Sequence, residues 1–442
     1  MKAGGAFLMG CLLLFAFPLI GFSAELQDLI QIPQKGRQYL PISADKPILT
    51  VTEQQLRAQQ YLSRHFSPWD EDGYSHLNVT KEQIIAFQRS AVQRGGWGSD
   101  RKPVSKESLN GIKKQIAVPF ASLNRNGIAL MESDLRILPT KKAFYPPAYT
   151  PSSGYSFDRL QNSTIKPGKP LRLLHLSFNG SWVFVSSGTA VGWVEKSKVA
   201  DVTDAFIAVW KELPQGVFIK DNTALKSTKD NRTLAIAKLG TLLPLKNNAP
   251  LLPVQTPGGE TQMDEIKVIP ESYAPFPLPF NARNAAGILE AIGPERYGWG
   301  GSLGLRDCSA MTRDYFTVFG IWLPRNSADQ AKMGAVTTVN TLPASQKGSL
   351  LQQKGIPFAT LVHLPGHIML YVGEHKRKPI VFHNLWGIHI LKNKKPDRYV
   401  IGKSIFSTLR PGAEFPNRMP NRLLEDRIDS FNTLTITEEK SL

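Results

Sequence analysis

The strongest constraint on the fold is a stretch, from about residue 120 to residue 270, in which short β-rich runs alternate with turn signals. Asn179-Gly180 separates two such runs, and Asn-Gly between apolar runs predicts a two-stranded hairpin. A second set of runs spans about 205 to 270. The spacing of these runs predicts two small β-barrels, each of roughly 70 to 80 residues.

The predicted secondary structure differs on either side of this stretch. Residues from about 50 to 117 favour helices, with starts expected at Thr52 and Thr80. Pro270, Pro275, Pro277 and Pro279 predict a stiff, exposed linker. Beyond it we expect helices at 285–292 and 309–319, then strands at 358–363, 367–372 and 380–382. A chain of 442 residues is too long for one ordinary core, so we interpret these regions as separate domains.

The N-terminus resembles a secretory signal. Lys2 precedes an apolar run over 6–17, and Gly21, Ser23 and Ala24 offer a cleavage site. The run is short for a membrane span, and no later segment is long and apolar enough to cross a bilayer. An uncleaved anchor and a lipid on Cys11 are alternatives. The prediction is export to the periplasm or beyond, without stable membrane insertion after signal removal.

Cysteine usage then becomes informative. The chain has two cysteines, Cys11 and Cys308, and signal removal leaves Cys308 alone. Exported proteins usually pair their cysteines as disulfides, so a single one is either buried filler or a reactive thiol.

The formal net charge of +17 suits an anionic partner. Export argues against nucleic acid, and no basic run interleaved with aromatic residues favours it. An acidic wall polymer fits the charge, and a merely solvated basic surface fits it equally well.

The segment around Cys308 carries the candidate chemistry. Gly300-Gly301 predicts a tight turn at which backbone can approach a ligand, and Cys308 then begins a predicted helix. The positive end of a helix dipole favours a thiolate, which is the attacking form of cysteine. The pattern is compatible with packing as well as with catalysis.

A nucleophilic cysteine needs a base, and five of the eight histidines lie in the last region: His363, His367, His375, His383 and His389. His367 heads an apolar strand directly after Pro365-Gly366, and His383 ends the next apolar run. On neighbouring antiparallel strands the two could meet, so that one orients the other.

The run Tyr297 to Ser309 and the segment His367 to Gly373 together resemble the NlpC/P60 family of cell-wall cysteine peptidases. More narrowly, the chain resembles members with an N-terminal helical region and two bacterial SH3-like barrels. The resemblance implies an α+β fold in which a papain-like catalytic domain follows these parts. The expected divisions are a signal peptide at 1–24, a helical region at 25–118, barrels at 119–202 and 203–275, the peptidase domain at 280–425 and a tail at 426–442.

The resemblance also implies roles for single residues. Cys308 is the expected nucleophile, His367 the general base, His383 its orienting partner and Tyr297 a group that stabilises the oxyanion. The expected substrate-binding residues are Asp307, Ser309, Ser327 and Glu132. Of these, Asp307 and Ser327 would hold a free amine of the substrate. Two positions depart from the family pattern: Ala310 replaces a frequent glycine, and Ala190-Val191 stands where relatives place a tyrosine.

By this resemblance the expected activity is hydrolysis of peptidoglycan stem peptides between γ-D-glutamate and a diamino acid, with preference for a free N-terminal L-Ala. No metal or cofactor is expected, because the late histidines lack compact ligand spacing and Pro365 interrupts the pair His363 and His367. We expect a monomer. The alternatives are a non-catalytic wall-binding protein, or an amidase or acyltransferase on the same Cys-His scaffold. The third-position diamino acid stays open.

Overall fold

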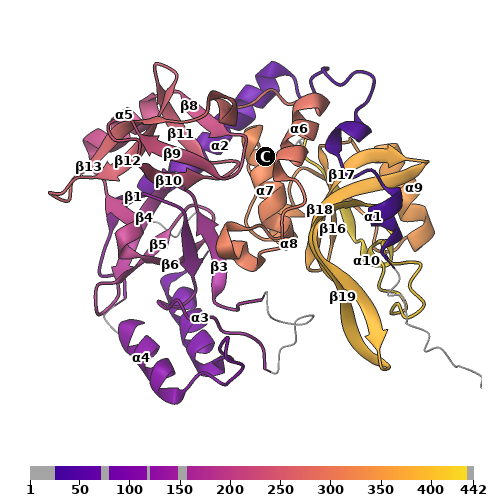
Figure 1. Cartoon of the computed structure of the whole chain (residues 1–442), viewed down its shortest axis with the longest axis horizontal. Helices are drawn as coiled ribbons and strands as arrows, with labels where there is room; N and C mark the ends of the chain where they lie inside the picture. Colours follow the sequence, from indigo (N-terminus) through magenta and orange to yellow (C-terminus); the bar gives the residue numbers. More distant parts are fainter. Residues whose placement is uncertain (1–24, 71–78, 117–119, 148–156, 436–442) are drawn as a thin grey trace, which may run out of the picture.

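The computed structural model describes residues 25–70, 79–116, 120–147 and 157–435. The predicted signal segment with Cys11, and also His76, lie outside the described residues. Figure 1 shows two lobes, with two β-rich units in one, a third sheet in the other, and α6 and α7 between them. No helix in these ranges is long and apolar enough to cross a membrane.

The N-terminal region is helical, as expected. Its elements are α1 (Gln27–Gln31), η1 (Gly36–Tyr39), α2 (Val51–Asp70), α3 (Lys81–Arg94) and α4 (Lys106–Ile116). The predicted cap at Thr80 is confirmed, because its hydroxyl accepts from the Gln83 amide in a capping box. The other start was misplaced: the reciprocal bonds at α2 join Thr50 and Glu53, two residues before Thr52.

The first β-rich unit is an antiparallel seven-stranded sheet in the order β3-β2-β6-β5-β4-β1-β7. Its strands are β1 (Arg125–Ala129), β2 (Ser133–Arg136), β3 (Gln161–Ile165), β4 (Pro170–Leu176), β5 (Trp182–Ser186), β6 (Val191–Glu195) and β7 (Val199–Asp201), with η3 (Lys196–Lys198) before the last. The hairpin predicted at Asn179-Gly180 joins β4 to β5, and Gly180 adopts the positive φ of 71° that the turn requires.

The second unit repeats this architecture in the order β10-β9-β13-β12-β11-β8-β14. It contains α5 (Asp204–Glu212), β8 (Gln215–Phe218), β9 (Thr223–Ser227), β10 (Thr233–Ala237), β11 (Leu242–Lys246), β12 (Ala249–Gln255), β13 (Thr261–Lys267), η4 (Pro270–Ser272) and β14 (Tyr273–Pro275). The prolines expected in a stiff, exposed linker are indeed mostly exposed, namely Pro270, Pro275 and Pro279, but the segment is not a free linker. β14 pairs with β8, and the Leu278 amide donates to the carbonyl of Val318, so the segment is packed into both neighbours.

The last domain is built on a six-stranded sheet in the order β15-β20-β16-β17-β18-β19. Its strands are β15 (Ala335–Thr338), β16 (Thr360–Leu364), β17 (His367–His375), β18 (Lys378–Lys392), β19 (Lys395–Ser407) and β20 (Ser430–Thr433). Its helices are α6 (Ala282–Ile292), η5 (Trp299–Gly304), α7 (Cys308–Val318), α8 (Ser327–Gln330), α9 (Ala344–Lys354) and α10 (Leu424–Arg427). Because β20 pairs with β15 and β16, the sheet continues beyond residue 425, where we expected a tail.

The main core lies between this sheet and the helices α6 and α7. Met311, Tyr315 and Phe316 of α7 pack there with Ile368 and Leu370 of β17, all of them buried. Residues from the N-terminal region join the same core, among them Tyr39 and Leu49. The first 25 described residues therefore brace the last domain instead of forming a region of their own.

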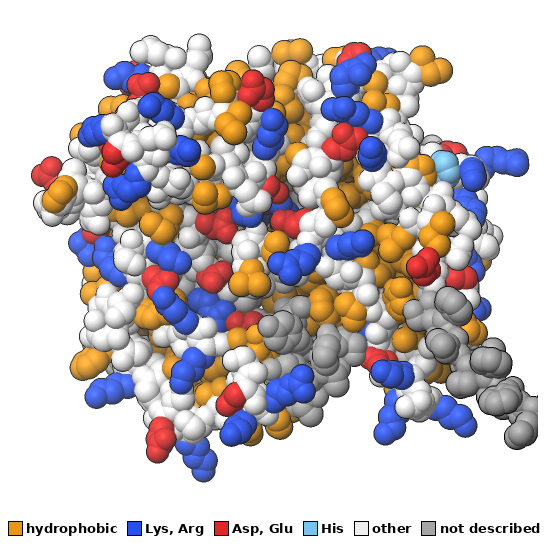
Figure 2. All heavy atoms as spheres, in the orientation of Figure 1, with side chains coloured by type: hydrophobic (Ala, Val, Ile, Leu, Met, Phe, Trp, Pro, Cys, Tyr) orange, Lys and Arg blue, Asp and Glu red, His pale blue; other side chains and the backbone are white. Residues whose placement is uncertain are grey.

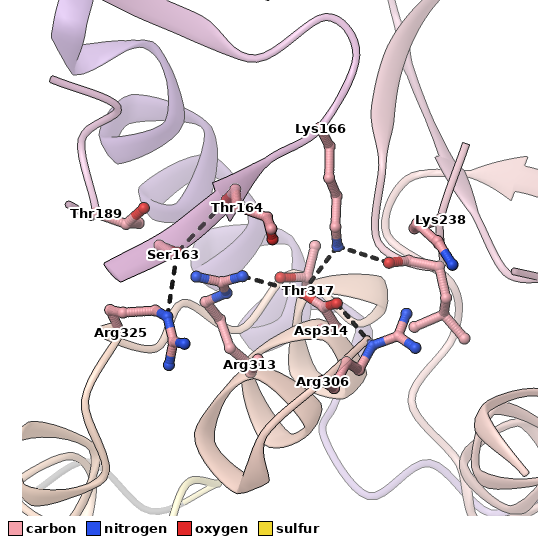
Figure 3. A network of polar contacts seen from close by, with 12 residues as sticks. Ser163, Thr164, Lys166, Thr189, Lys238, Arg306, Arg313, Asp314, Thr317 and Arg325 are labelled. Carbon is pink, nitrogen blue, oxygen red and sulfur yellow. Dashed lines mark hydrogen bonds and ion pairs between the residues drawn. The ribbon is translucent and has the colours of Figure 1, made fainter. Parts of the chain in front are cut away.

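A buried ion network joins the last domain to both β-rich units (Figure 3). Arg306 pairs with Asp314 at 2.8 Å and with Asp221 of the second unit at 2.7 Å. Lys166 of the first unit pairs with the same Asp314 at 2.8 Å and donates to the Leu239 carbonyl. A buried charge is tolerated only when its partners are in place, so this network sets how the three units sit around α7.

The basic surface has no single focus on the face drawn in Figure 2. Lys and Arg side chains are scattered over both lobes there, interleaved with Asp and Glu. On that face the charge resembles a solvated basic surface more than a track for a polyanion.

Candidate active site

Cys308 is the first residue of α7, where the sequence places it. Asp307 caps this helix by accepting from the Ala310 amide at 2.8 Å. The thiol is free and only 7% exposed, and the backbone amides of Ile368 and Ser309 are hydrogen-bonded to its sulfur. Because Ile368 follows His367 directly, the thiol lies beside the head of β17.

The two candidate histidines are brought together by the pairing of β17 with β18. His367 Nε2 lies 2.8 Å from His383 Nδ1, and both rings are buried. His383 Nε2 in turn lies 2.9 Å from the hydroxyl of Ser407 on β19. Three adjacent strands therefore supply one polar chain that ends next to Cys308.

The position of each proton in this hydrogen-bonded chain can be assigned by starting from Ser407. The Ser407 hydroxyl donates its one proton to the Thr408 carbonyl at 2.8 Å, so its oxygen can only accept from His383 Nε2. His383 Nδ1 then accepts a hydrogen bond from the N–H at Nε2 of His367. This leaves the Nδ1 lone pair of His367 unprotonated, which is the state that a general base requires.

Ser407 was not anticipated from the sequence, because a serine at the end of a strand carries no distinguishing pattern. Its neighbour Thr408 is held from the N-terminal region: the amide and hydroxyl of Thr408 donate to Asp28 of α1 at 2.8 and 2.9 Å. The far end of the histidine chain is thus anchored by a residue 380 positions away in the sequence.

The electrostatics correct one expectation. Burial, reinforced by the Asp307 carboxylate, raises the pKa of Cys308 to about 12, against the helix dipole that favours a thiolate. Burial and the charges of Arg427, His363 and Arg398 lower the pKa of His367 to about 3. The resting pair is therefore a neutral thiol and a neutral imidazole, and the proton moves only when the sulfur attacks.

Tyr297 lies close enough to the thiol to be coupled to it. Burial and the neighbouring Cys308 and Asp307 raise the pKa of Tyr297 well above its usual value, so its hydroxyl keeps its proton. Phe157 and Trp386 pack on the Tyr297 ring with centroid distances of 5.9 and 5.7 Å. The tyrosine is a positioned O–H donor beside the sulfur.

The glycine turn before Cys308 is where the first β-rich unit meets the site. Gly300 and Gly301 have positive φ values of 63° and 88°. A Cβ on Gly300 would lie 2.5 Å from the carbonyl oxygen of Gln161, and one on Gly301 would lie 2.7 Å from Thr164. Both glycines are thus required by conformation and by the close approach of β3.

Asp307 is fully engaged within the protein. Arg325 donates to its two carboxylate oxygens at 3.2 and 2.7 Å, and the Gly300 amide and Ser309 hydroxyl also donate to it. The guanidinium of Arg325 further bonds Ser309 and, across the domain junction, Ser163. Sequence reasoning assigned Asp307 to a substrate amine and missed Arg325, although the residue lies two positions before the predicted Ser327.

The remaining candidates lie at the margins of this site. Ser327 begins α8 and is half-buried. Glu132, on the first β-rich unit, lies against Gly304 of η5, and burial raises its pKa above the usual range. His363 hydrogen-bonds Asp429 at 2.7 Å. Within the described ranges no group of three or more His, Cys, Asp or Glu side chains could hold a metal ion.

The Asp307–Arg325 pair leads to a stability prediction. Asp307→Asn keeps a good helix cap but leaves the buried Arg325 charge without its partner, which typically costs about 3–5 kcal/mol. We expect that loss in the free energy of unfolding by urea denaturation. The double variant with Arg325→Gln should recover part of it, because the uncompensated charge is gone. A loss under about 1 kcal/mol for Asp307→Asn would mean that the carboxylate acts only as a cap.

Four segments match known protein-family models. Residues 6–119 match the N-terminal NLPC_P60 stabilising domain, 143–195 an SH3 domain of SH3b1 type, 204–249 an SH3 domain of SH3b2 type, and 294–403 the NlpC/P60 family. Among curated proteins no sequence matches the chain.

Two solved structures are similar to this chain to different degrees. An NlpC/P60 endopeptidase from Photobacterium damselae subsp. piscicida superposes with a TM-score of 0.83 at 23% identity, over 92% of this chain and 98% of that one. An NlpC/P60 family protein from Bacillus cereus ATCC 10987 gives 0.45 at 14% identity, over 70% and 99%. The first shows that the whole multidomain fold is shared.

Fold and site together define a papain-like cysteine peptidase: a thiol heads a helix and packs against a strand that begins with histidine. The chain belongs to the NlpC/P60 family, in the branch that carries an N-terminal stabilising domain and two SH3 domains before the catalytic domain. The predicted α+β fold class is confirmed. These domains are those of a cell-wall peptidase.

Proposed function

We propose that the chain is an exported cysteine endopeptidase that cuts peptidoglycan stem peptides between γ-D-glutamate and the diamino acid. The observation that carries this proposal is the chain Ser407–His383–His367, which leaves a lone pair on His367, the residue before the Ile368 whose amide is hydrogen-bonded to the buried thiol. Such an arrangement is costly to bury and has no use in a module that only binds the wall.

The reaction follows from these groups. His367 Nδ1 takes the thiol proton as Cys308 Sγ attacks the γ-carbonyl carbon, and the carbonyl oxygen becomes an oxyanion that accepts from Tyr297. The C–N bond then breaks, and His367 returns the proton to the leaving amine of the diamino acid. Water, deprotonated by the same His367, hydrolyses the thioester and frees Cys308. Ser309 and Asp307 hold Arg325 in place next to this centre.

The position of the first SH3 domain supports a preference for short stems. Its strand β3 approaches η5 so closely that Gly300 and Gly301 have no room for a side chain. Arg325 is bonded to Ser163 of the same strand. A cleft walled in this way accommodates a stem that ends in L-Ala better than one still attached to glycan.

The test of this proposal uses defined peptides. With L-Ala-γ-D-Glu-diamino acid tripeptides, mass spectrometry should find free diamino acid and L-Ala-γ-D-Glu as the only products. Release of ammonia or transfer to an added amine would favour the amidase or acyltransferase alternative. Binding to sacculi without any cleavage would favour the wall-binding one.

Acetylating the N-terminal L-Ala should lower kcat/KM at least about 30-fold, since a desolvated ammonium that loses its charged partner costs about 2–5 kcal/mol. Ser327 and Glu132 are the candidate acceptors that Arg325 does not occupy, and Ser327→Ala should narrow the difference between free and acetylated peptides. A peptide that begins with L-Val in place of L-Ala, with its amine free, controls for bulk. Equal cleavage of free and acetylated peptides would point to intact, glycan-linked wall as the substrate.

A further inference from the structure

A hollow separate from the active site lies where α2 and both SH3 domains meet the catalytic helix α7. It is a cavity of about 60 Å³, and neither Cys308 nor His367 lines it. Three basic residues line it: Lys166 and Lys169 from the turn between β3 and β4, and Arg313 from α7. We call this hollow the basic cavity.

The charges that face the basic cavity do not balance. Asp314 is the one acidic side chain among the described residues that line it. This carboxylate is already shared, because Lys166 and Arg306 each pair with it at 2.8 Å (Figure 3). Arg313 reaches it only at 3.5 Å, through one of its N–H groups. The cavity therefore carries an excess of positive charge.

Lys169 contributes a cation that has no acidic partner within the described ranges. Its Nζ lies 3.2 Å from Nδ1 of His65 on α2 and donates to the carbonyl of the same residue at 3.3 Å. Burial, and then the charges of Arg313 and Lys166, lower the pKa of Lys169 to about 7. Burial, and then the charge of Lys169, lower the pKa of His65 well below its usual value, so this imidazole is neutral. An anion in the cavity would stabilise the charged form of Lys169.

The basic cavity offers hydrogen-bond donors from different elements of the fold. Arginine carries five N–H donors, and the one hydrogen bond of the Arg313 side chain to a described residue is the contact with Asp314. Thr164 and Thr189 of the first SH3 domain line the same hollow. Donors that approach from several directions suit a tetrahedral oxyanion, whose four oxygens also point in different directions. A water molecule needs roughly 10–15 Å³ of such space. The cavity therefore has room for one small ion.

We propose that the basic cavity binds a small tetrahedral oxyanion, sulfate or inorganic phosphate, between Arg313 of α7 and Lys169 of the first SH3 domain. Hydrogen bonds from arginine and lysine to an anion are charge-assisted, and they are stronger away from bulk water. The bound ion would bridge the catalytic helix and the first SH3 domain, and so stabilise the arrangement of the domains around α7. This site does not depend on the proposed hydrolytic reaction.

The test measures binding of sodium sulfate to the full chain by isothermal titration calorimetry and by Tm, with ionic strength held constant by sodium chloride. We expect one saturable site per chain, and a Tm about 3 °C higher or more at a sulfate concentration about 100-fold above Kd. Arg313→Gln and Lys169→Gln should each weaken the affinity at least about 10-fold, because each variant removes a charged donor. Glutamine at position 169 keeps an N–H group that can donate to His65.

The pH dependence of sulfate binding adds a readout that a general salt effect would not produce. The titratable side chains that line the cavity with Lys169 are Tyr61 and His65 from α2, Lys166 from its own turn, and Arg313 and Asp314 from α7. The second SH3 domain contributes no charged side chain to the described lining. Because the pKa of Lys169 is about 7, this residue is charged at pH 6 and neutral at pH 8.5, whereas the charge of sulfate is constant. Affinity should therefore be at least about fivefold higher at pH 6, and Lys169→Gln should remove most of this difference.

Arg94→Gln is the matched control, because Arg94 is an exposed arginine on α3 that donates to Ser90 and lies outside the basic cavity. It should bind sulfate as the wild type does. Stabilisation that rises with sulfate without saturating would reflect the general exclusion of sulfate from protein surfaces and would overturn the proposal. Unchanged affinity in both cavity variants, or acetate binding as tightly as sulfate, would overturn it as well.

Discussion

Cys308→Ala is expected to abolish peptide hydrolysis, with kcat reduced about 10⁵-fold or more, because no thioester can form without the sulfur. The fold should persist, since the side chain is small, forms no disulfide and lies at the start of a helix whose cap is Asp307. Rates from defined stem peptides, with far-UV circular dichroism and Tm beside them, would check both statements. A variant with near wild-type turnover would exclude the thiol mechanism.

Chemical modification gives an independent readout of the same thiol. Iodoacetamide should label Cys308 and inactivate the enzyme, but slowly, because the residue is only 7% exposed and the pKa of its thiol is raised to about 12. Labelling should speed up in mild denaturant, and inactivation should track labelling one to one. Fast labelling of the native protein would show that the resting sulfur is already a thiolate.

His367→Ala is expected to be nearly as damaging, with a loss in kcat of about 10⁴-fold or more, because nucleophile and base act as a unit. His383→Ala should retain clearly more activity, since it removes only the orientation of His367 and not the base. Steady-state kinetics on one peptide would rank the two variants. An unimpaired His367→Ala enzyme would assign the base to another histidine, with His363 the first to examine.

The pH profile separates a base from a structural histidine. A lowered pKa means that His367 stays deprotonated until the pH falls toward about 3, so activity present at pH 7 should persist at pH 5. An ordinary histidine, with a pKa near 6.5, would already be largely protonated there. In His383→Ala the loss of activity on the acid side should shift to higher pH, because solvent reaches His367 and its pKa rises toward the usual value. An unchanged acid side of the pH profile would show that His383 does not influence the pKa of His367.

The sequence alone determined the order of the parts and the local placement of the reactive groups. Short β-rich runs with an Asn-Gly turn, a cysteine heading a helix after paired glycines, and a histidine heading a strand after Pro365-Gly366 are all set by local preferences of neighbouring residues. These features predicted the fold class, the starts of α7 and β17 to within one residue, and the likeness to the family.

Only the tertiary structure decided which hydrogen-bond partners these groups have and which of them are charged. Ser407, Asp28 and Arg325 act through partners far away in the sequence, and no periodicity or turn signal reports such contacts. The proline segment became a strand because β8 offered it an edge. The thiol is protonated instead of charged, because burial raises its pKa more than a helix dipole lowers it. That burial arises from the packing of segments that are far apart in the sequence.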